Sequence, residues 1–296
     1  MSILLSFEYM RKKLIDNLVS DYKFVSHSVI GKSVCDRDID CLQIGNKSKM
    51  VLWVGAFHGM EWLTSFLLLK FLRTLCRDIE TSKDICGVSV GNQLQKRGLC
   101  VVPCLNPDGV EISIRGSLSA GKYKYFIDQI SAGDTSRWQA NAHGVDLNHN
   151  YDAGWEELHQ LEIENGITNP GPTRYGGIHS ESEPETKFLI KLCEKNNFEH
   201  AIAFHSQGEE IYWKYGKNIP ENSEVLSKIF AIVSGYKLSS PEGLAVGGGF
   251  KDWFISRFNR PAFTVEIGKG RNPILFSQLD SIYEKLEKMM YLSTLV

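Results

Sequence analysis

Two short apolar runs, far apart in the chain, are each followed by residues that can bind a metal ion. His58 and Glu61 come directly after the run at 51–56, and His205 follows the run at 201–204. Short, continuous apolar runs are typical of strands that are buried on both faces. In open α/β sheets, ligand sites lie just beyond the carboxyl ends of such strands. We therefore expect the two runs to be strands whose ends bring these three side chains to one site.

Two imidazoles and one carboxylate form a donor set typical of a catalytic zinc ion, which takes three protein ligands and keeps a further position open for water. Spacing alone leaves a structural interpretation open, because the chain contains 8 His and 35 Asp and Glu residues. On that interpretation, each histidine is a packed, hydrogen-bonded turn residue. The metal hypothesis therefore depends on motifs elsewhere in the chain.

The remaining pattern predicts an α/β fold. Apolar positions 63, 66, 67, 71 and 75 recur with the period of a helix directly after the first strand. Alternation of apolar and polar residues across 23–44 predicts a strand hairpin. Further strands are expected at 99–105, 200–204 and 262–267, and helices at 4–18, 61–77, 222–233, 249–257 and 273–292. Strands that alternate with helices predict a mostly parallel sheet covered on both faces.

The segment from about 113 to 180 has a different composition. It is rich in Gly, Ser, Asn and charged residues and has little sustained periodicity. A stretch of that length inside a compact domain is more typical of a functional loop system than of a linker. Ser182 and Glu185 then predict a capping box, with Pro184 in the first turn of a new helix.

Composition bounds the organisation of the chain and its partners. The sequence has no Pro/Gly/Ser-rich linker or repeat, so we expect residues 1–296 to form a single catalytic domain, with a short N-terminal helix (about 1–20) before the core. The net charge of −2 argues against nucleic acid or an anionic membrane as a partner. The apolar region at 62–75 is interrupted by Lys70 and Arg73 and is too short to cross a membrane.

Two further features predict a cytoplasmic location. The N-terminus lacks the basic start, the long apolar stretch and the cleavage site of a secretory signal. The chain has 7 cysteines, an odd number, and it is long enough to fold without disulfides. We expect these cysteines to be reduced thiols.

Glu266 is the one acidic residue in the apolar run at 262–268. Burial of an unpaired carboxylate costs roughly several kcal/mol, so an inward-facing Glu266 must face a cation or be protonated. The alternative is that Glu266 lies on a solvated edge of its strand.

Five motifs give the chain a specific family resemblance. They are GAFHGMEW at 55–62, NPDGV at 106–110, GVDLN at 144–148, FHSQG at 204–208 and FTVEIG at 263–268. In this order and at these intervals they resemble the zinc carboxypeptidase family typified by pancreatic carboxypeptidase A. The closer likeness is to its bacterial branch, which cleaves γ-D-glutamyl-diaminopimelate bonds in murein peptides. The resemblance extends over almost the whole chain and implies one α/β/α domain around a mixed, mostly parallel eight-stranded sheet.

The resemblance also implies roles for individual residues. His58, Glu61 and His205 match the family's three zinc ligands. Asp146 matches the carboxylate that orients a ligand histidine, and Glu266 matches the general base. Relatives stabilise the developing oxyanion with an arginine between the second and third motifs. Arg137 and Arg115 are the candidates here, and Arg137, which precedes Trp138, fits the family's Arg/Trp pattern better.

Two departures from the family concern substrate binding. Exo-acting relatives have Asn-Arg after the aspartate segment, and the arginine holds the terminal carboxylate of the substrate. Here the pair is Asn148 and His149. Lys251 falls near the specificity pocket, where a cation favours a substrate side chain that carries a carboxylate, as diaminopimelate does. Three glycines at 247–249 predict a mobile or closely approached loop next to it.

The resemblance thus predicts a metallopeptidase that binds Zn²⁺ and hydrolyses an amide bond in small murein peptides, with the γ-D-Glu–diaminopimelate bond as the expected target. One alternative is a zinc carboxypeptidase that removes C-terminal residues from other peptides. Another is a non-catalytic binding homologue. The three ligands and Glu266 favour an enzyme over a binding homologue, because all four are present.

Overall fold

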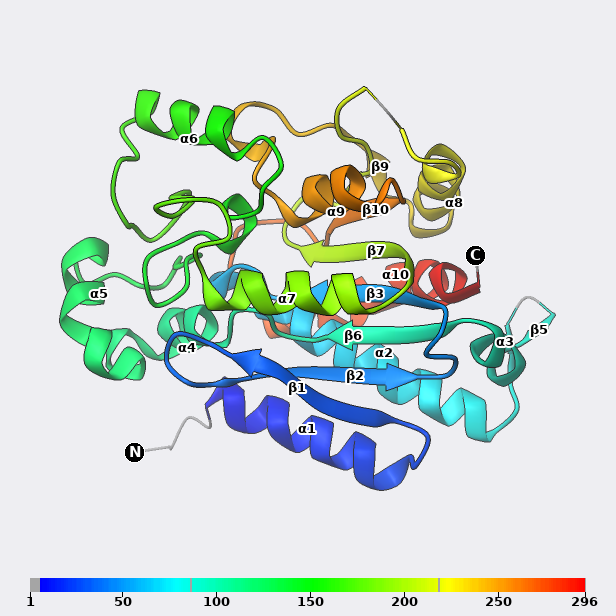
Figure 1. Ribbon diagram of the computed structural model, residues 1–296. Helices are drawn as coiled ribbons and strands as arrows, with labels where there is room; N and C mark the ends of the chain where they lie inside the picture. The colour runs from blue at the N-terminus through cyan, green and yellow to red at the C-terminus, as the bar shows by residue number, and fades with distance from the viewer. Residues whose placement is uncertain (1–5, 86, 218, 296) are drawn as a thin grey trace.

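An eight-stranded sheet forms the centre of the protein, whose computed structural model describes residues 6–85, 87–217 and 219–295 (Figure 1). Its strands are β1 (Ser26–Lys32), β2 (Asp38–Ile44), β3 (Met50–Gly55), β6 (Gly98–Val102), β7 (Phe198–His205), β8 (Glu210–Tyr212), β9 (Lys237–Leu238) and β10 (Ala262–Glu266). They lie in the order β1-β2-β6-β3-β7-β10-β8-β9. The central strands β6, β3, β7 and β10 run parallel, whereas β1, β2 and β8 form antiparallel pairs. The predicted mixed, mostly parallel sheet is confirmed.

Helices cover both faces of the sheet. One face packs against α1 (Phe7–Asp21), α2 (Leu63–Glu80), α3 (Val90–Lys96), α8 (Ser223–Ser234) and α10 (Leu279–Leu295), and the other packs against α7 (Pro184–Lys195) and α9 (Phe250–Phe258). In Figure 1, α7 lies in front of the sheet, and α2 and α10 lie behind it. Successive side chains of a strand point to opposite faces, so Val51 and Trp53 join the core under α2 while Leu52 and Val54 join the core under α7. Burial on both sides explains why β3 is apolar throughout.

The predicted elements are present with shifted ends. The helix expected at 4–18 is α1, which follows Ser6, whose Oγ accepts a hydrogen bond from the Tyr9 N–H at 3.1 Å. Positions 1–5 lie outside the described residues. The strand expected at 99–105 is β6, and it ends at Val102 because the chain then turns into α4 (Pro107–Arg115). The hairpin expected at 23–44 is the antiparallel pair β1 and β2.

The segment at 113–180 contains more regular structure than its composition predicts. It includes α5 (Lys124–Ser131) and α6 (Trp155–Glu164), with 3-10 turns at Ser117–Tyr123 and Leu147–His149. Ile127 is the buried residue of α5, and Leu158 and Glu162 are the buried residues of α6. So few buried positions produce little apolar periodicity, which is why the sequence indicates a loop system here and does not indicate these two helices.

The predicted capping box is also wrong, although the helix that it announces exists. The N-cap residue of α7 is Glu183, and its side chain makes no capping hydrogen bond. Ser182 Oγ instead donates to Glu183 Oε1 at 2.8 Å. The carboxyl group of Glu185 is fully buried and accepts hydrogen bonds from the Val34 N–H and from Asn141 Nδ2.

The smaller elements lie at the ends of the sheet. β4 (Asp84–Ile85) and β5 (Val88–Ser89) form a separate two-stranded ladder, and further 3-10 turns lie at Gly59–Glu61, Gly243–Ala245 and Phe276–Gln278.

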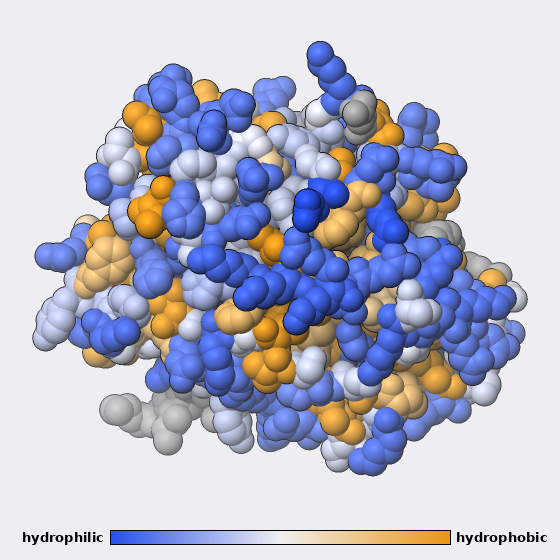
Figure 2. Space-filling view, viewed as in Figure 1, coloured by the Kyte–Doolittle hydropathy of each residue, from blue (hydrophilic) through white to orange (hydrophobic). Residues whose placement is uncertain are grey.

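The face shown in Figure 2 is mainly hydrophilic, with apolar residues in small separate groups. Within the described ranges, no helix is both long enough and apolar enough to cross a membrane.

Candidate active site

The sheet brings the three predicted metal ligands together. His58 follows β3, Glu61 ends the 3-10 turn Gly59–Glu61, and His205 is the last residue of β7. β3 and β7 are parallel neighbours, with Gly55 paired to Phe204, so their carboxyl ends meet at one edge. His58 Nδ1 lies 2.9 Å from Glu61 Oε1, and His205 Nδ1 lies 3.0 Å from Glu61 Oε2.

A close backbone approach fixes the turn that carries Glu61. A Cβ at Gly59 would collide with the carbonyl oxygen of Gly109, so the position requires glycine. The Gly59 N–H donates to the Gln139 carbonyl at 3.0 Å, and the Met60 N–H donates to the Trp138 carbonyl at 2.8 Å. The ligand turn is therefore held against α4 on one side and against the segment around Gln139 on the other.

This donor set fits a divalent metal ion. One ligand atom from each of His58, Glu61 and His205 lies within 4.8 Å of the other two. Glu61 is 3% exposed, and the ion pairs found for it within the described residues are with these two histidines, so a cation among the three would compensate a buried carboxylate. Two imidazoles and a carboxylate are a common catalytic zinc set. The three residues form a potential metal-binding site.

Asp146 orients the first histidine. Its Oδ1 lies 3.0 Å from His58 Nε2, and its Oδ2 accepts a hydrogen bond from the Arg174 N–H at 3.0 Å. Burial by itself would raise the pKa of the Asp146 carboxyl, but the nearby histidines and these hydrogen bonds outweigh it and hold the pKa well below its usual range. An ionised Asp146 keeps the proton of His58 on Nε2, which leaves Nδ1 free for a metal.

Glu266 lies beside the metal ligands. It ends β10, the parallel neighbour of β7, and is paired there with His205. Its side chain is half-buried and lines the same cavity as both histidines. Burial, reinforced by the negative charge of Glu61, raises the pKa of the Glu266 carboxyl well above its usual range. A carboxylate whose pKa lies above its usual range is a stronger base, which suits a residue that accepts and returns a proton.

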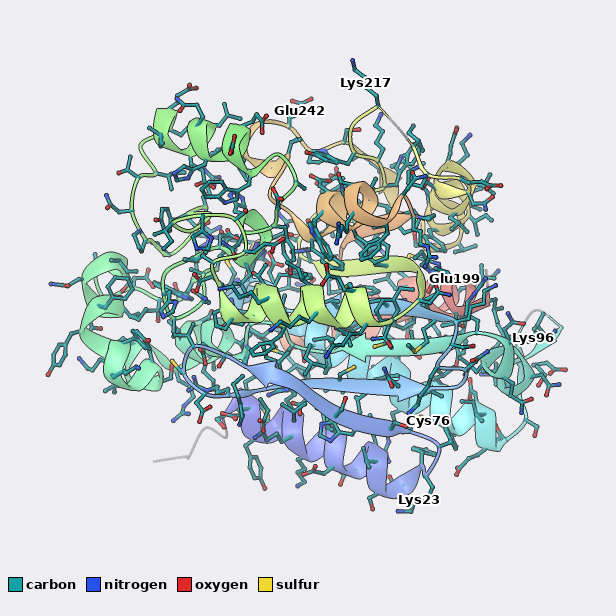
Figure 3. All side chains as sticks on the ribbon, in the orientation of Figure 1. Lys23, Cys76, Lys96, Glu199, Lys217 and Glu242 are labelled. Carbon is teal, nitrogen blue, oxygen red and sulfur yellow. The ribbon has the colours of Figure 1, made fainter. Side chains whose placement is uncertain are left out.

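A cavity of about 520 Å³ opens over these residues. Its rim includes Leu161 of α6, Asn165 directly after that helix, and the loop from Pro241 to Ala245. Figure 3 labels Glu242 on this loop, which lies beside α6 at the top of the view. The cavity has the size of a small-molecule or short-peptide site.

The three predicted substrate-binding residues all line this cavity, but each is held by a neighbour. Asn148 Oδ1 accepts a hydrogen bond from the Phe250 N–H at 3.1 Å, and His149 Nδ1 lies 2.8 Å from Oε1 of the buried Glu162. The Lys251 ammonium forms an ion pair with Asp252 and donates to the Lys214 carbonyl at 3.0 Å. Lys251 thus lines the cavity as a cation that is already paired with a carboxylate.

The glycine loop predicted beside Lys251 is closely approached. Gly248 has a φ of +64°, and a Cβ there would lie 2.6 Å from Leu158 Cδ2 and 2.8 Å from the His149 carbonyl oxygen. This contact presses the loop against the 3-10 turn Leu147–His149.

The structure does not bring Arg137 or Arg115 to the site. Both side chains are exposed, and neither lines the cavity. Trp138 is fully buried, so the chain turns Arg137 outward and presents Gln139 to the cavity instead. Sequence reasoning missed Gln139 because it sought an arginine, and it missed Arg174, whose segment carries no family motif.

The parallel centre of the sheet gathers two histidines and two glutamates at its carboxyl edge, an arrangement typical of zinc-dependent hydrolases. Residues 12–291 match the zinc carboxypeptidase family. The chain is 36% identical over 274 residues to γ-D-glutamyl-L-diamino acid endopeptidase 1 of Lysinibacillus sphaericus, a match that covers 92% of this chain and 67% of that protein. The chain belongs to the zinc carboxypeptidase family and is a zinc metallopeptidase.

Solved structures share the fold. Bovine thrombin-activatable fibrinolysis inhibitor superimposes with a TM-score of 0.75 at 17% identity, over 98% of this chain and 95% of that one. Murein-tripeptide amidase MpaA from Escherichia coli O157 superimposes with a TM-score of 0.57 at 21% identity, over 92% of each chain. These likenesses establish the architecture.

Proposed function

We propose that this metallopeptidase hydrolyses the amide bond between γ-D-glutamate and diaminopimelate in bacterial murein peptides. The observation that carries the proposal is the 36% identity, over 92% of the chain, to an endopeptidase named for γ-D-glutamyl-L-diamino acid bonds. The cavity supports it, because His149 stands where the resemblance places the arginine that grips a C-terminal carboxylate in exo-acting relatives.

In this proposal Glu266 is the general base. It takes a proton from the attacking water and returns it to the nitrogen of the leaving amine. His58, Glu61 and His205 would hold the zinc ion, which when bound would supply Lewis-acid chemistry to the scissile carbonyl and to the attacking water. Asp146 holds His58 in the tautomer that presents Nδ1 to the metal.

Gln139 takes the place of Arg137 in this mechanism as the donor to the scissile carbonyl oxygen. Thr173 Oγ1 donates to Gln139 Oε1, so Nε2 is the end of the amide that is left to face the cavity. The Gln139 backbone is tied to the ligand turn through Gly59. Gln139→Ala should lower kcat more than it changes KM, and an unchanged kcat would exclude this role.

The direct test is hydrolysis of the tripeptide L-Ala-γ-D-Glu-diaminopimelate by the zinc-loaded protein, read by mass spectrometry. We expect L-Ala-D-Glu and free diaminopimelate. A substrate with an amidated C-terminus separates the alternative activity, since a carboxypeptidase that reads the terminal carboxylate would lose it. Release of C-terminal residues from ordinary peptides, without cleavage of the tripeptide, would replace the proposal by that alternative.

We infer also that residues 1–296 form one catalytic domain that works in the cytoplasm. One sheet joins β1 near the N-terminus to β10 near the C-terminus, which supports a single domain. The odd number of cysteines supports a reducing compartment. Acid quenching of cells followed by alkylation under denaturing conditions should label all 7 cysteines by intact mass, and a smaller number would contradict the location.

A further inference from the structure

Arg174 is a cation at the cavity without a carboxylate partner. It lines the cavity together with Gln139 and Asp146, and its side chain is exposed. Within the described ranges, no carboxylate oxygen lies within 4.0 Å of the Arg174 guanidinium. Lys251 is the other lysine or arginine that lines the cavity, and it is paired with Asp252. The positive charge that the cavity offers to a substrate is therefore carried mainly by Arg174.

The backbone around Arg174 is held firmly to the reaction centre. Arg174 has a φ of 66°, a left-handed conformation that is uncommon for arginine. Its N–H donates to Asp146 Oδ2 at 3.0 Å, and the Pro172 carbonyl accepts hydrogen bonds from the Gln139 N–H at 2.9 Å and the Ala140 N–H at 3.1 Å. Strained conformations that the surroundings enforce are concentrated at functional sites. Arg174 therefore follows directly after Thr173, the residue whose hydroxyl hydrogen-bonds to Gln139.

This wall of the cavity is distinct from the wall formed by His149 and Lys251. The Gln139 wall is built from the segments around 139–140 and 172–174, and Gln139 is the residue assigned to the scissile carbonyl. The His149 wall is built from the glycine loop and the start of α9. A substrate group bound by Arg174 therefore belongs to the residue that supplies the scissile carbonyl.

We propose that Arg174 binds the free α-carboxylate of the γ-linked D-glutamate and so selects substrates that carry a carboxylate at this position over substrates that do not. This inference rests on the proposed function. In a γ-linked glutamate the side-chain carboxyl forms the scissile amide, so the α-carboxylate stays free a few bonds from the reacting carbonyl. A neutral residue, or a glutamate whose free carboxyl is amidated, carries no charge at the corresponding position. A guanidinium can hold such a carboxylate through two parallel hydrogen bonds.

The test compares two tripeptides with the zinc-loaded enzyme. One is L-Ala-γ-D-Glu-diaminopimelate, and the other carries an α-carboxamide on the same D-glutamate. We expect the wild type to prefer the carboxylate in kcat/KM by about 10- to 100-fold, the range for hydrogen bonds to charged groups. Arg174→Gln should lose that preference by slowing cleavage of the carboxylate substrate alone, and Arg174→Lys should keep part of it. Arg73→Gln, which removes an exposed arginine of α2, is the matched control.

Binding gives a readout that does not depend on turnover. Calorimetry with Glu266→Gln should give the same carboxylate preference, and the preference should vanish in Glu266→Gln combined with Arg174→Gln. Equal slowing of both substrates by Arg174→Gln, or a wild type without preference, would overturn the inference while leaving the proposed function intact. A wild type that cleaves neither tripeptide would overturn the proposed function and this inference with it.

Discussion

Glu266 and His205 occupy paired positions on β10 and β7, so one strand supplies a metal ligand and its neighbour supplies the carboxylate beside it. The two glutamates of the site differ in environment. Glu61 contacts both histidines, whereas the pKa of Glu266 is raised by burial and by the charge of Glu61. Similar side chains thus receive different tasks, metal binding for Glu61 and proton transfer for Glu266.

Glu266→Gln should keep the zinc and the fold while lowering kcat by roughly two to four orders of magnitude, because glutamine keeps the shape of the side chain but cannot accept the proton. Zinc content by plasma emission and the turnover of the tripeptide are measured on the same sample. Turnover within a few-fold of the parent would mean that Glu266 takes no part in the chemistry.

His205→Ala is the contrasting variant, since it should remove zinc and activity together. His179→Ala is its matched control, because His179 is exposed and hydrogen-bonds to the carbonyl of Ser180. Full zinc occupancy in His205→Ala would show that the ligand assignment is wrong.

At the scale of elements, the buried strands could be predicted, whereas α5 and α6 could not. β3 and β7 are apolar on both faces, so their position and the residues at their ends follow from the sequence. α5 and α6 bury only one or two side chains each, which leaves little periodic signal. Gln139 and Arg174 escaped prediction for a related reason: hydrogen bonds between segments far apart in the chain bring them to the cavity.

The start of α9 depends on the Lys251–Asp252 ion pair. Lys251 is 5% exposed and Asp252 is 3% exposed, and Asp252 Oδ2 also accepts a hydrogen bond from the Gly247 N–H at 3.0 Å. Lys251→Met would leave a buried carboxylate without its cation, so it should lower the free energy of unfolding by about 3 kcal/mol. Urea unfolding measures the loss. The double variant with Asp252→Asn should lose less, and a single variant as stable as the parent would contradict this structural role.

The whole molecule contributes to the site, because its residues come from three strands and from loops between distant elements. Glu185 of α7 shows how these parts are joined. The Val34 N–H, in the turn after β1, donates to Glu185 Oε1 at 3.1 Å, and Asn141 Nδ2, near the wall that carries Gln139, donates to Oε2 at 3.2 Å. One buried carboxyl thus links the edge of the sheet, α7 and a wall of the cavity.

Glu185 should make the stability of the whole protein depend on pH. Burial, followed by the negative charge of Asp108, raises the pKa of the Glu185 carboxyl from 4.5 to about 8. Between these values the folded state keeps a proton that the unfolded state has lost, so this contribution to stability is fully present below pH 4.5 and is lost as the pH rises through about 8. Glutamine stays neutral at every pH, so Glu185→Gln should not lose this contribution. As the pH rises from about 5 to about 8.5, the free energy of unfolding of Glu185→Gln should therefore increase relative to that of the parent. Chemical unfolding of both proteins across this range measures the difference. Two parallel pH profiles would mean that Glu185 is ionised in the folded protein and that its hydrogen bonds offset the cost of burial.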